Sequence, residues 1–155
     1  MLIAGNADAT VDYSTGARAF FDAASNTTRY LLTFKEAGHS IGLSAAPEAM
    51  RAKLWDKDWF EDPVWRAERI NEINAHFITA FLDRYVKGDT TRDAYLMVRT
   101  PESNDGVWPA QAVLPYGAYS PSDANITVWK GFQRSHAHGL ELLRAAPGAY
   151  PVPKH

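Results

Sequence analysis

Hydrophobic and polar positions alternate in short blocks along the N-terminal part of the chain. Residues 1–5, MLIAG, form an apolar run that predicts a strand leading into a polar loop. In residues 14–24 the apolar side chains recur at helical spacing, and Ser14 or Thr15 is available as the N-cap. Residues 29–34, RYLLTF, predict a second strand. Together these elements predict a right-handed strand–helix–strand unit in a parallel sheet.

A long helix is predicted in the middle of the chain. Apolar residues recur at steps of three or four up to Tyr85, after Asp62 and Pro63, which suit an N-cap and a first-turn proline. Gly88 supplies the C-terminal break. Before this helix, residues 41–62 are aromatic and charged without clean periodicity, which predicts an excursion over the surface.

The pattern of hydrophobic and polar positions is less regular in the C-terminal part of the chain. Residues 94–98, AYLMV, predict a strand, and residues 100–125 are dense in Pro, Gly, Ser, Asn and Asp, which predicts a long loop. Residues 133–145, QRSHAHGLELLRA, predict a last short helix before a proline-rich tail. The sequence shows no internal repeat.

Composition predicts one globular domain. The 155 residues are 46% hydrophobic and 12% aromatic, which is enough to form a core. The formal net charge of -2 gives no electrostatic reason to expect nucleic acid or an anionic membrane as a partner. No apolar run approaches the roughly 20 residues of a membrane span, and no targeting signal is visible, so the sequence does not fix a compartment. With no cysteine, thiolate chemistry and disulfides are excluded.

The pentapeptide GHSIG, residues 38–42, matches the G-x-S-x-G pattern of a serine hydrolase's nucleophile elbow. That turn needs an apolar strand directly before the serine, whereas a polar loop precedes it here, and the upstream residues hold too few strands for a nucleophile in that position. Its partners would have to be Asp105 and either His136 or His138, which lie in or beyond the loop-rich region. The pattern therefore disfavours Ser40 as a nucleophile.

A carboxylate and an imidazole follow the two predicted N-terminal strands. Asp8 follows the first strand and His39 the second, at the edge where open α/β sheets place their sites. Asp8 would hold one ring nitrogen of His39 in the useful tautomer, while the other nitrogen takes a proton from a serine and returns it to the leaving group. The alternative is structural: Asp8 caps its loop, and His39 is a turn histidine with satisfied hydrogen bonds.

Four segments resemble one known family when they are taken together. They are residues 1–13, MLIAGNADATVDY; 29–40, RYLLTFKEAGHS; 62–89, DPVWRAERINEINAHFITAFLDRYVKGD; and 129–143, WKGFQRSHAHGLELL. They resemble the C-terminal half of α/β-hydrolases of the dienelactone hydrolase-like, esterase-like kind. The resemblance implies an α/β fold with late parallel strands and flanking helices, and it implies that Asp8 is the catalytic acid and His39 the catalytic histidine.

The resemblance also implies how the chain is organised. The final helix of the hydrolase core would run from Val64 to Lys87, so that residues 1–88 form the core portion, with the excursion at about 41–62. Residues 89–155 would form a family-specific, loop-rich extension. The half that carries the nucleophile elbow and most oxyanion-hole donors lies outside this sequence. Because one sheet edge would then be unpaired, we expect a partner, which is either the missing half or a second copy pairing edge to edge.

Two functions follow from these expectations. The first is a serine-type ester hydrolase moiety that supplies acid and base toward a small-molecule ester, with the nucleophile outside the chain. The second is a non-catalytic, partner-dependent interaction or structural domain on the same scaffold. Fold and triad indicate a reaction class and no particular substrate.

Cofactor and metal sites are not expected from the sequence. His136 and His138 are two positions apart, which on a helix points them in different directions, and no cluster of further ligands accompanies them. His76 lies within the long predicted helix, where a surface or packing role is expected. The tryptophans could line an acyl or aromatic pocket, or they could pack under long loops; they are Trp55, Trp59, Trp65, Trp108 and Trp129.

Overall fold

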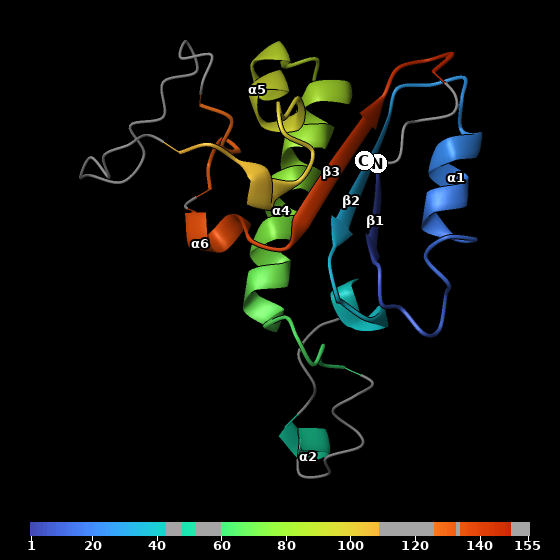
Figure 1. The fold of residues 1–155 in the computed structure, drawn as a ribbon, viewed down its shortest axis with the longest axis vertical. Coiled ribbons are helices and arrows are strands. Elements are labelled where there is room, and N and C mark those ends of the chain that lie inside the picture. Colours follow the sequence, from blue (N-terminus) through green and yellow to red (C-terminus); the bar gives the residue numbers. More distant parts are fainter. Residues whose placement is uncertain (43–47, 52–59, 109–125, 133, 150–155) are drawn as a thin grey trace.

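The centre of the protein is a mixed three-stranded sheet with helices on both faces (Figure 1). The computed structural model describes residues 1–42, 48–51, 60–108, 126–132 and 134–149. The strands are β1 (Leu2–Gly5), β2 (Arg29–Phe34) and β3 (Leu140–Ala145), in the order β1-β2-β3. β1 pairs parallel to β2, as predicted, whereas β3 pairs antiparallel to β2.

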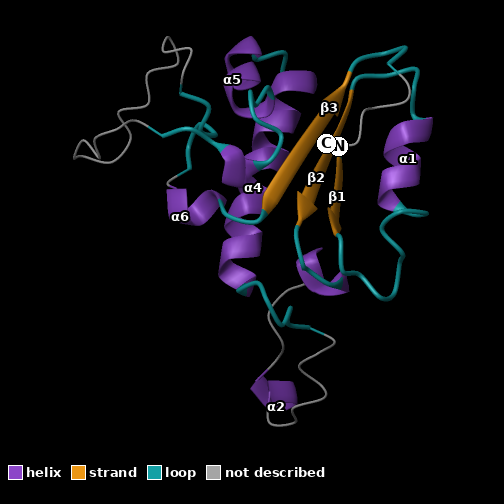
Figure 2. Ribbon diagram, viewed as in Figure 1, coloured by secondary structure: helices purple, strands orange, loops and turns teal. Residues whose placement is uncertain are grey.

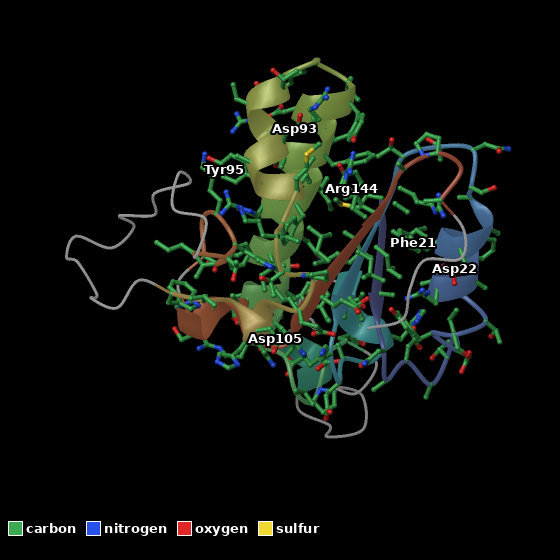
Figure 3. The ribbon with its side chains drawn as sticks, turned by 45° about the horizontal axis from the view of Figure 1, so that its top comes forward. Phe21, Asp22, Asp93, Tyr95, Asp105 and Arg144 are labelled. Carbon is green, nitrogen blue, oxygen red and sulfur yellow. The ribbon has the colours of Figure 1, made fainter. Side chains whose placement is uncertain are left out.

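The central strand β2 is buried along its whole length because it is covered on both faces. Tyr30, Leu32 and Phe34 belong to the core cluster beneath helix α4 (Ala67–Tyr85). Leu31 belongs to the second cluster, beneath helix α1 (Ala17–Ala23). The two helices flank the sheet on opposite sides, and Phe21 of α1 and Tyr95 lie to either side of it (Figures 2 and 3).

The long helix α4 is amphipathic and packs one face on the sheet. Its buried apolar residues are Ile70, Ile73, Phe77 and Ala80. The helix begins at Ala67, later than the predicted start at Asp62 and Pro63.

The reason for the late start of α4 lies in Asp62. Its carboxylate accepts hydrogen bonds from the backbone N–H groups of Val64 and Trp65, at 2.9 and 2.7 Å, and so caps the turn before the helix. At the other end Gly88 adopts a left-handed conformation with φ 77°, in agreement with the predicted break.

The start of helix α1 also differs in detail from expectation. Helix α1 has Gly16 as its N-cap, in place of the predicted Ser14 or Thr15. The side chain of Asp12 binds both of those residues, because its Oδ1 accepts hydrogen bonds from the Ser14 hydroxyl and from the Thr15 N–H. The carboxylate therefore organises the turn that precedes α1.

The predicted strand over residues 94–98 is wrong. These residues overlap helix α5 (Asp93–Leu96), which follows the 3₁₀ turn η2 (Thr90–Arg92). Arg84 of α4 binds Asp93 at 2.6 Å, and Leu96 is fully buried in the core shared with α4. These contacts with α4 outweigh the strand preference of a short apolar run.

The predicted helix over residues 133–145 is only partly correct. Helix α6 (Arg134–Ala137) is followed by Gly139 at φ 81°, and β3 then begins. Leu140 and Leu142 pack in the α4 cluster, while Leu143 packs in the α1 cluster. The alternation of apolar side chains between two cores explains why this segment forms a strand.

The residues assigned by resemblance to an extension are continuous with the core, because β3 joins its sheet. The described part of the surface excursion contains η1 (His39–Gly42) and α2 (Glu48–Arg51), and the described part of the long loop contains η3 (Ser103–Asp105). Residues 43–47, 52–59 and 109–125 lie outside the described residues. Among the described helices none is long and apolar enough to cross a membrane.

Candidate functional site

Asp8 and His39 meet at the carboxyl edge of the two parallel strands. Asp8 lies in the loop that leaves β1, and His39 opens η1, shortly after β2 ends. Oδ2 of Asp8 and Nδ1 of His39 are 2.8 Å apart, which is a hydrogen-bonding distance. The contact predicted between the carboxylate and the imidazole is therefore present in the structure.

The Asp8 carboxylate is held by more than the imidazole. Its Oδ1 accepts hydrogen bonds from the backbone N–H groups of Thr10 and Val11, at 2.8 and 3.0 Å. Burial alone would raise the pKa of this carboxyl, but the hydrogen bonds from Val11, His39 and Thr10 together lower it below its usual value. Asp8 is thus fixed in position as a carboxylate.

His39 is open to solvent on the side away from Asp8. Its side chain is 54% exposed, whereas that of Asp8 is 13% exposed. Within the described residues, only the Nδ1 atom of the ring has a hydrogen-bond partner. As far as the described residues go, the Nε2 atom is therefore available to a substrate or to a second catalytic group.

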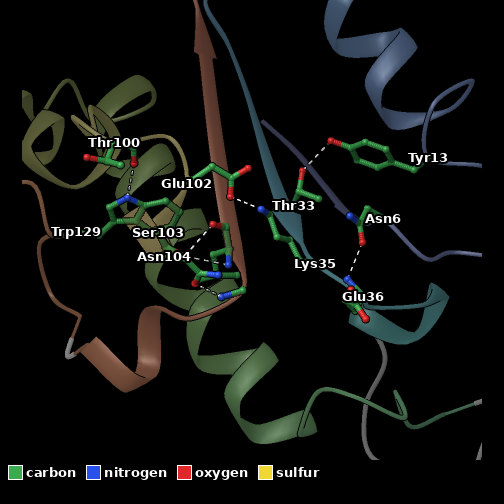
Figure 4. Close-up of polar contacts among 12 residues, drawn as sticks. Asn6, Tyr13, Thr33, Lys35, Glu36, Thr100, Glu102, Ser103, Asn104 and Trp129 are labelled. Atoms are coloured by element: carbon green, nitrogen blue, oxygen red, sulfur yellow. Dashed lines mark hydrogen bonds and ion pairs between the residues drawn. The ribbon is translucent and has the colours of Figure 1, made fainter. Parts of the chain in front are cut away.

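Three polar side chains fix the loop that carries His39. Asn6 accepts a hydrogen bond from the Glu36 N–H at 2.6 Å (Figure 4), and Asp62 accepts one from the Gly38 N–H, also at 2.6 Å. Beyond the histidine, the Asn74 amide donates to the Ile41 carbonyl at 2.8 Å. These contacts come from the loop after β1, from the segment before α4 and from α4 itself, so the position of the histidine depends on three distant parts of the chain.

The backbone of this loop is unusual at one position. Glu36 has φ 62°, in the left-handed region that residues other than glycine seldom adopt. The Glu36 N–H bond to Asn6 is among the contacts that hold this conformation. Such strain persists only where the surrounding structure over-determines it, and it occurs often at functional sites.

Gly5 allows the two loops to approach each other. A Cβ atom at this position would lie 2.3 Å from the Ala37 carbonyl oxygen and 2.5 Å from that of Gly38. The Ala7 N–H donates a hydrogen bond to the same Ala37 oxygen at 2.9 Å. The absence of a side chain at Gly5 thus lets the Asp8 loop cross close to the His39 loop.

Ser40 does not occupy an elbow geometry. β2 ends at Phe34, and segment 35–38 separates it from η1, so the strand does not run directly into the serine as an elbow requires. Ser40 is also buried, at 9% exposure. In the described residues up to Gly42, this arrangement does not present the serine hydroxyl above the end of a strand.

The remaining candidate residues are not brought together. In the part of the chain that the structure describes, no hydrogen bond joins Asp105 to His136 or His138, and no group of three His, Cys, Asp or Glu side chains is arranged for a metal ion. The backbone carbonyls of His136 and His138 both accept hydrogen bonds from Arg69. Their imidazoles are on an exposed part of the surface.

Two of the tryptophans have packing roles. Trp65 is buried, meets Phe34 edge to face, and donates its indole N–H to the Lys35 carbonyl at 2.8 Å. Trp129 is buried and donates in the same way to the Thr100 carbonyl (Figure 4). Trp108 is half-buried, and Trp55 and Trp59 lie outside the described residues.

The arrangement resembles the acid and base of a catalytic triad without its nucleophile. An imidazole whose inner nitrogen meets a fixed carboxylate, and whose outer nitrogen is open, can take up a proton and return it. The chain matches no family model, and neither the curated proteins nor the solved structures compared with it include a significant match.

Proposed function

We propose that this chain is an α/β-hydrolase moiety of the serine ester hydrolase type, in which Asp8 is the acid and His39 the general base. The nucleophilic serine is expected outside residues 1–155. The observation that supports the proposal is the 2.8 Å contact between Asp8 and the inner nitrogen of His39, with the outer nitrogen open. The placement of both groups at the carboxyl edge of parallel strands is consistent with it.

The chemistry assigned to the pair is proton transfer. Nε2 of His39 takes the proton from the serine hydroxyl as its oxygen attacks the ester carbonyl, and the imidazolium then gives that proton to the departing alkoxide. Water attacks the acyl-serine in the second half of the cycle, again with His39 as base. Asp8 stabilises the imidazolium and holds Nδ1 in the protonated form.

The free edge of β1 is where the missing nucleophile strand would be added to the sheet. β1 is hydrogen-bonded to β2 on one side, and no described strand pairs with its other side. An unpaired strand edge is a template for a further strand. The Asp8 loop leaves the end of this strand, so a strand docked there would bring its own carboxyl end close to the Asp8–His39 pair.

Exposed apolar side chains favour a second candidate function, a partner-dependent interaction domain without catalysis. Ile78 and Leu82 of α4 and its C-cap residue Val86 are exposed and spaced four residues apart, and α1 exposes Phe20. Exposed apolar side chains at such spacing mark association surfaces. The two functions share the expectation of a partner and differ in whether His39 acts on a serine.

Fluorophosphonate labelling distinguishes the two functions. The protein is isolated with its partners under native conditions, and the labelled residue is identified by peptide mass spectrometry. The hydrolase proposal expects a labelled serine outside residues 1–155, lost in His39→Ala and retained in His138→Ala, a matched exposed histidine. A folded complex that carries a partner but takes no label would refute the hydrolase and favour the interaction domain. Labelling of Ser40 would contradict both.

A further inference from the structure

A cavity lies between α4 and the segment around α6, away from the Asp8–His39 pair. Its volume is about 260 Å³, and its wall includes Arg69, Glu72, Ile73, His76, Phe132 and His136. It shares no lining residue with the proposed acid and base. The cavity is smaller than the roughly 300–1,000 Å³ of pockets for drug-sized ligands, which restricts an occupant to a small molecule.

Arg69 provides the fixed positive charge of this cavity. Its guanidinium lies 4.1 Å from the centre of the Trp65 ring, and its Nη2 donates to the carbonyls of His136 and His138 at 3.0 and 2.6 Å. Burial lowers the pKa of this arginine, but an arginine remains charged near neutral pH. The stacking and the two carbonyl contacts hold the guanidinium in one orientation.

His76 is held in an aromatic cage at the same cavity. Its ring lies within 5.4 Å, between centroids, of the rings of Phe77, Tyr95 and Phe132. Gly131 has φ 90°, and a Cβ there would lie 2.7 Å from the Cε1 atom of His76, so a side chain at this position would be strained and would clash. Burial lowers the pKa of His76, so the imidazole is neutral near pH 7.

Two buried nitrogen atoms of the lining residues lack partners. Within the described residues, neither Nε of Arg69 nor Nε2 of His76 has a hydrogen-bond partner. A buried polar atom without a partner costs about 1–3 kcal/mol, so most such atoms are satisfied by protein, water or a ligand. Other buried polar atoms of the described residues also lack a partner, but these two belong to side chains that line the same cavity.

The charged and apolar side chains of the lining limit which small molecules the cavity can bind. Ile73 is buried and Phe132 is half-buried, so part of the wall is apolar. Glu72 is exposed and is the only carboxylate among the described lining residues, and it would repel an anion of high charge more than one of single charge. The donors that the lining offers to a planar, singly charged acid are Arg69, the His136 ring and, in the tautomer protonated at Nε2, His76.

We propose that this cavity binds a small monocarboxylate with an apolar body. The carboxylate faces the Arg69 guanidinium and the His136 imidazole, and the apolar body contacts Ile73 and Phe132. A guanidinium fork fits carboxylate and phosphate alike, and the Glu72 carboxylate in the lining disfavours the more highly charged of the two. This assignment is independent of the proposed hydrolase function, because it uses none of the same residues.

Amide NMR with benzoate as the probe tests the proposal on the full chain. Saturable shifts are expected at Gly131, Phe132 and His136, with a dissociation constant below about 10 mM. Benzamide has the same shape without the charge, and it should cause no comparable shifts. Inorganic phosphate should bind more weakly than benzoate.

Single-residue variants test which side chains contact the carboxylate of benzoate. Arg69→Gln should weaken benzoate binding at least about tenfold, and His136→Gln about threefold, because each loses a donor to the carboxylate. Arg66→Gln, which replaces the exposed arginine at the N-cap of α4, is the matched control and should leave the affinity unchanged. His136 is exposed, so its variant keeps the test valid if Arg69→Gln fails to fold.

Three outcomes would overturn the assignment. They are the absence of saturable shifts in the folded protein, equal shifts with benzamide, and an equal loss of affinity in Arg66→Gln and Arg69→Gln. The first would exclude binding, the second would exclude recognition of the carboxylate, and the third would attribute binding to general surface charge.

Discussion

Replacing Gly5 with alanine should destabilise the protein and move the His39 loop. The added Cβ would lie 2.3 and 2.5 Å from the carbonyl oxygens of Ala37 and Gly38, which are backbone atoms that no side-chain rotation can move away. Overpacking of this kind costs about 1–3 kcal/mol. The displacement also breaks the hydrogen bond from the Ala7 N–H to Ala37, worth about 1 kcal/mol.

The expected loss in the free energy of unfolding is therefore about 2–4 kcal/mol, which is a large part of the 5–15 kcal/mol typical of a domain. Urea unfolding near neutral pH, followed by circular dichroism, measures it. Gly42→Ala is the matched control, because its Cβ would meet no atom of the described residues within 4 Å, and its effect should stay within about 0.5 kcal/mol.

The variant also tests the link between backbone packing and the site. If the crossing of the two loops positions His39, Gly5→Ala should weaken the hydrogen bond between Asp8 and His39. The ring ¹⁵N signals of His39 should then change in Gly5→Ala and stay unchanged in Gly42→Ala. A Gly5→Ala protein as stable as Gly42→Ala, with unchanged His39 signals, would refute the close-packing argument.

Three further changes have definite expected outcomes. The pKa of Asp8 in the folded protein is lowered from 3.8, so its ionised carboxylate stabilises the fold. This stabilisation should be complete above pH 3.8 and should be lost as the pH falls through the lowered pKa. Urea unfolding of Asp8→Asn and of the wild type over this pH range measures it. Asp62→Ala removes the acceptor for the Gly38 N–H and should cost about 1–3 kcal/mol in unfolding free energy, with Asp105→Ala as an exposed control. Phe77→Ala, at the fully buried centre of α4, should cost about 3–5 kcal/mol in the same assay, with Ile78→Ala as the exposed neighbour; equal losses would contradict the packing described.

The N-terminal elements were predictable because their signals are local. The runs at residues 1–5 and 29–34 are short, apolar and bounded by polar residues, and the structure has strands Leu2–Gly5 and Arg29–Phe34 there. The meeting of Asp8 and His39 follows from a general rule, since parallel neighbours place their following loops at one edge. Local pattern and a topological rule were enough for this part of the site.

The C-terminal strand and the support of the His39 loop were not predictable in the same way. Residues 140–145 are apolar on both faces, so their pattern does not separate a strand from a short helix; pairing with β2 decides between them. Asn6, Asp62 and Asn74 each make one contact across a long stretch of sequence. Such contacts carry no periodic signal, so only the folded arrangement identifies the residues that hold His39.

The antiparallel pairing of β3 has a consequence for synthesis on the ribosome. β2 emerges early, but the partner for its second side, residues 140–145, is made more than a hundred residues later, with Arg29 opposite Ala145. At about 5–20 residues per second, the nascent chain spends several seconds with one side of a mostly apolar strand open. Chaperones that bind extended apolar segments would find their target in residues 29–34 during that interval, and closure by β3 would release them.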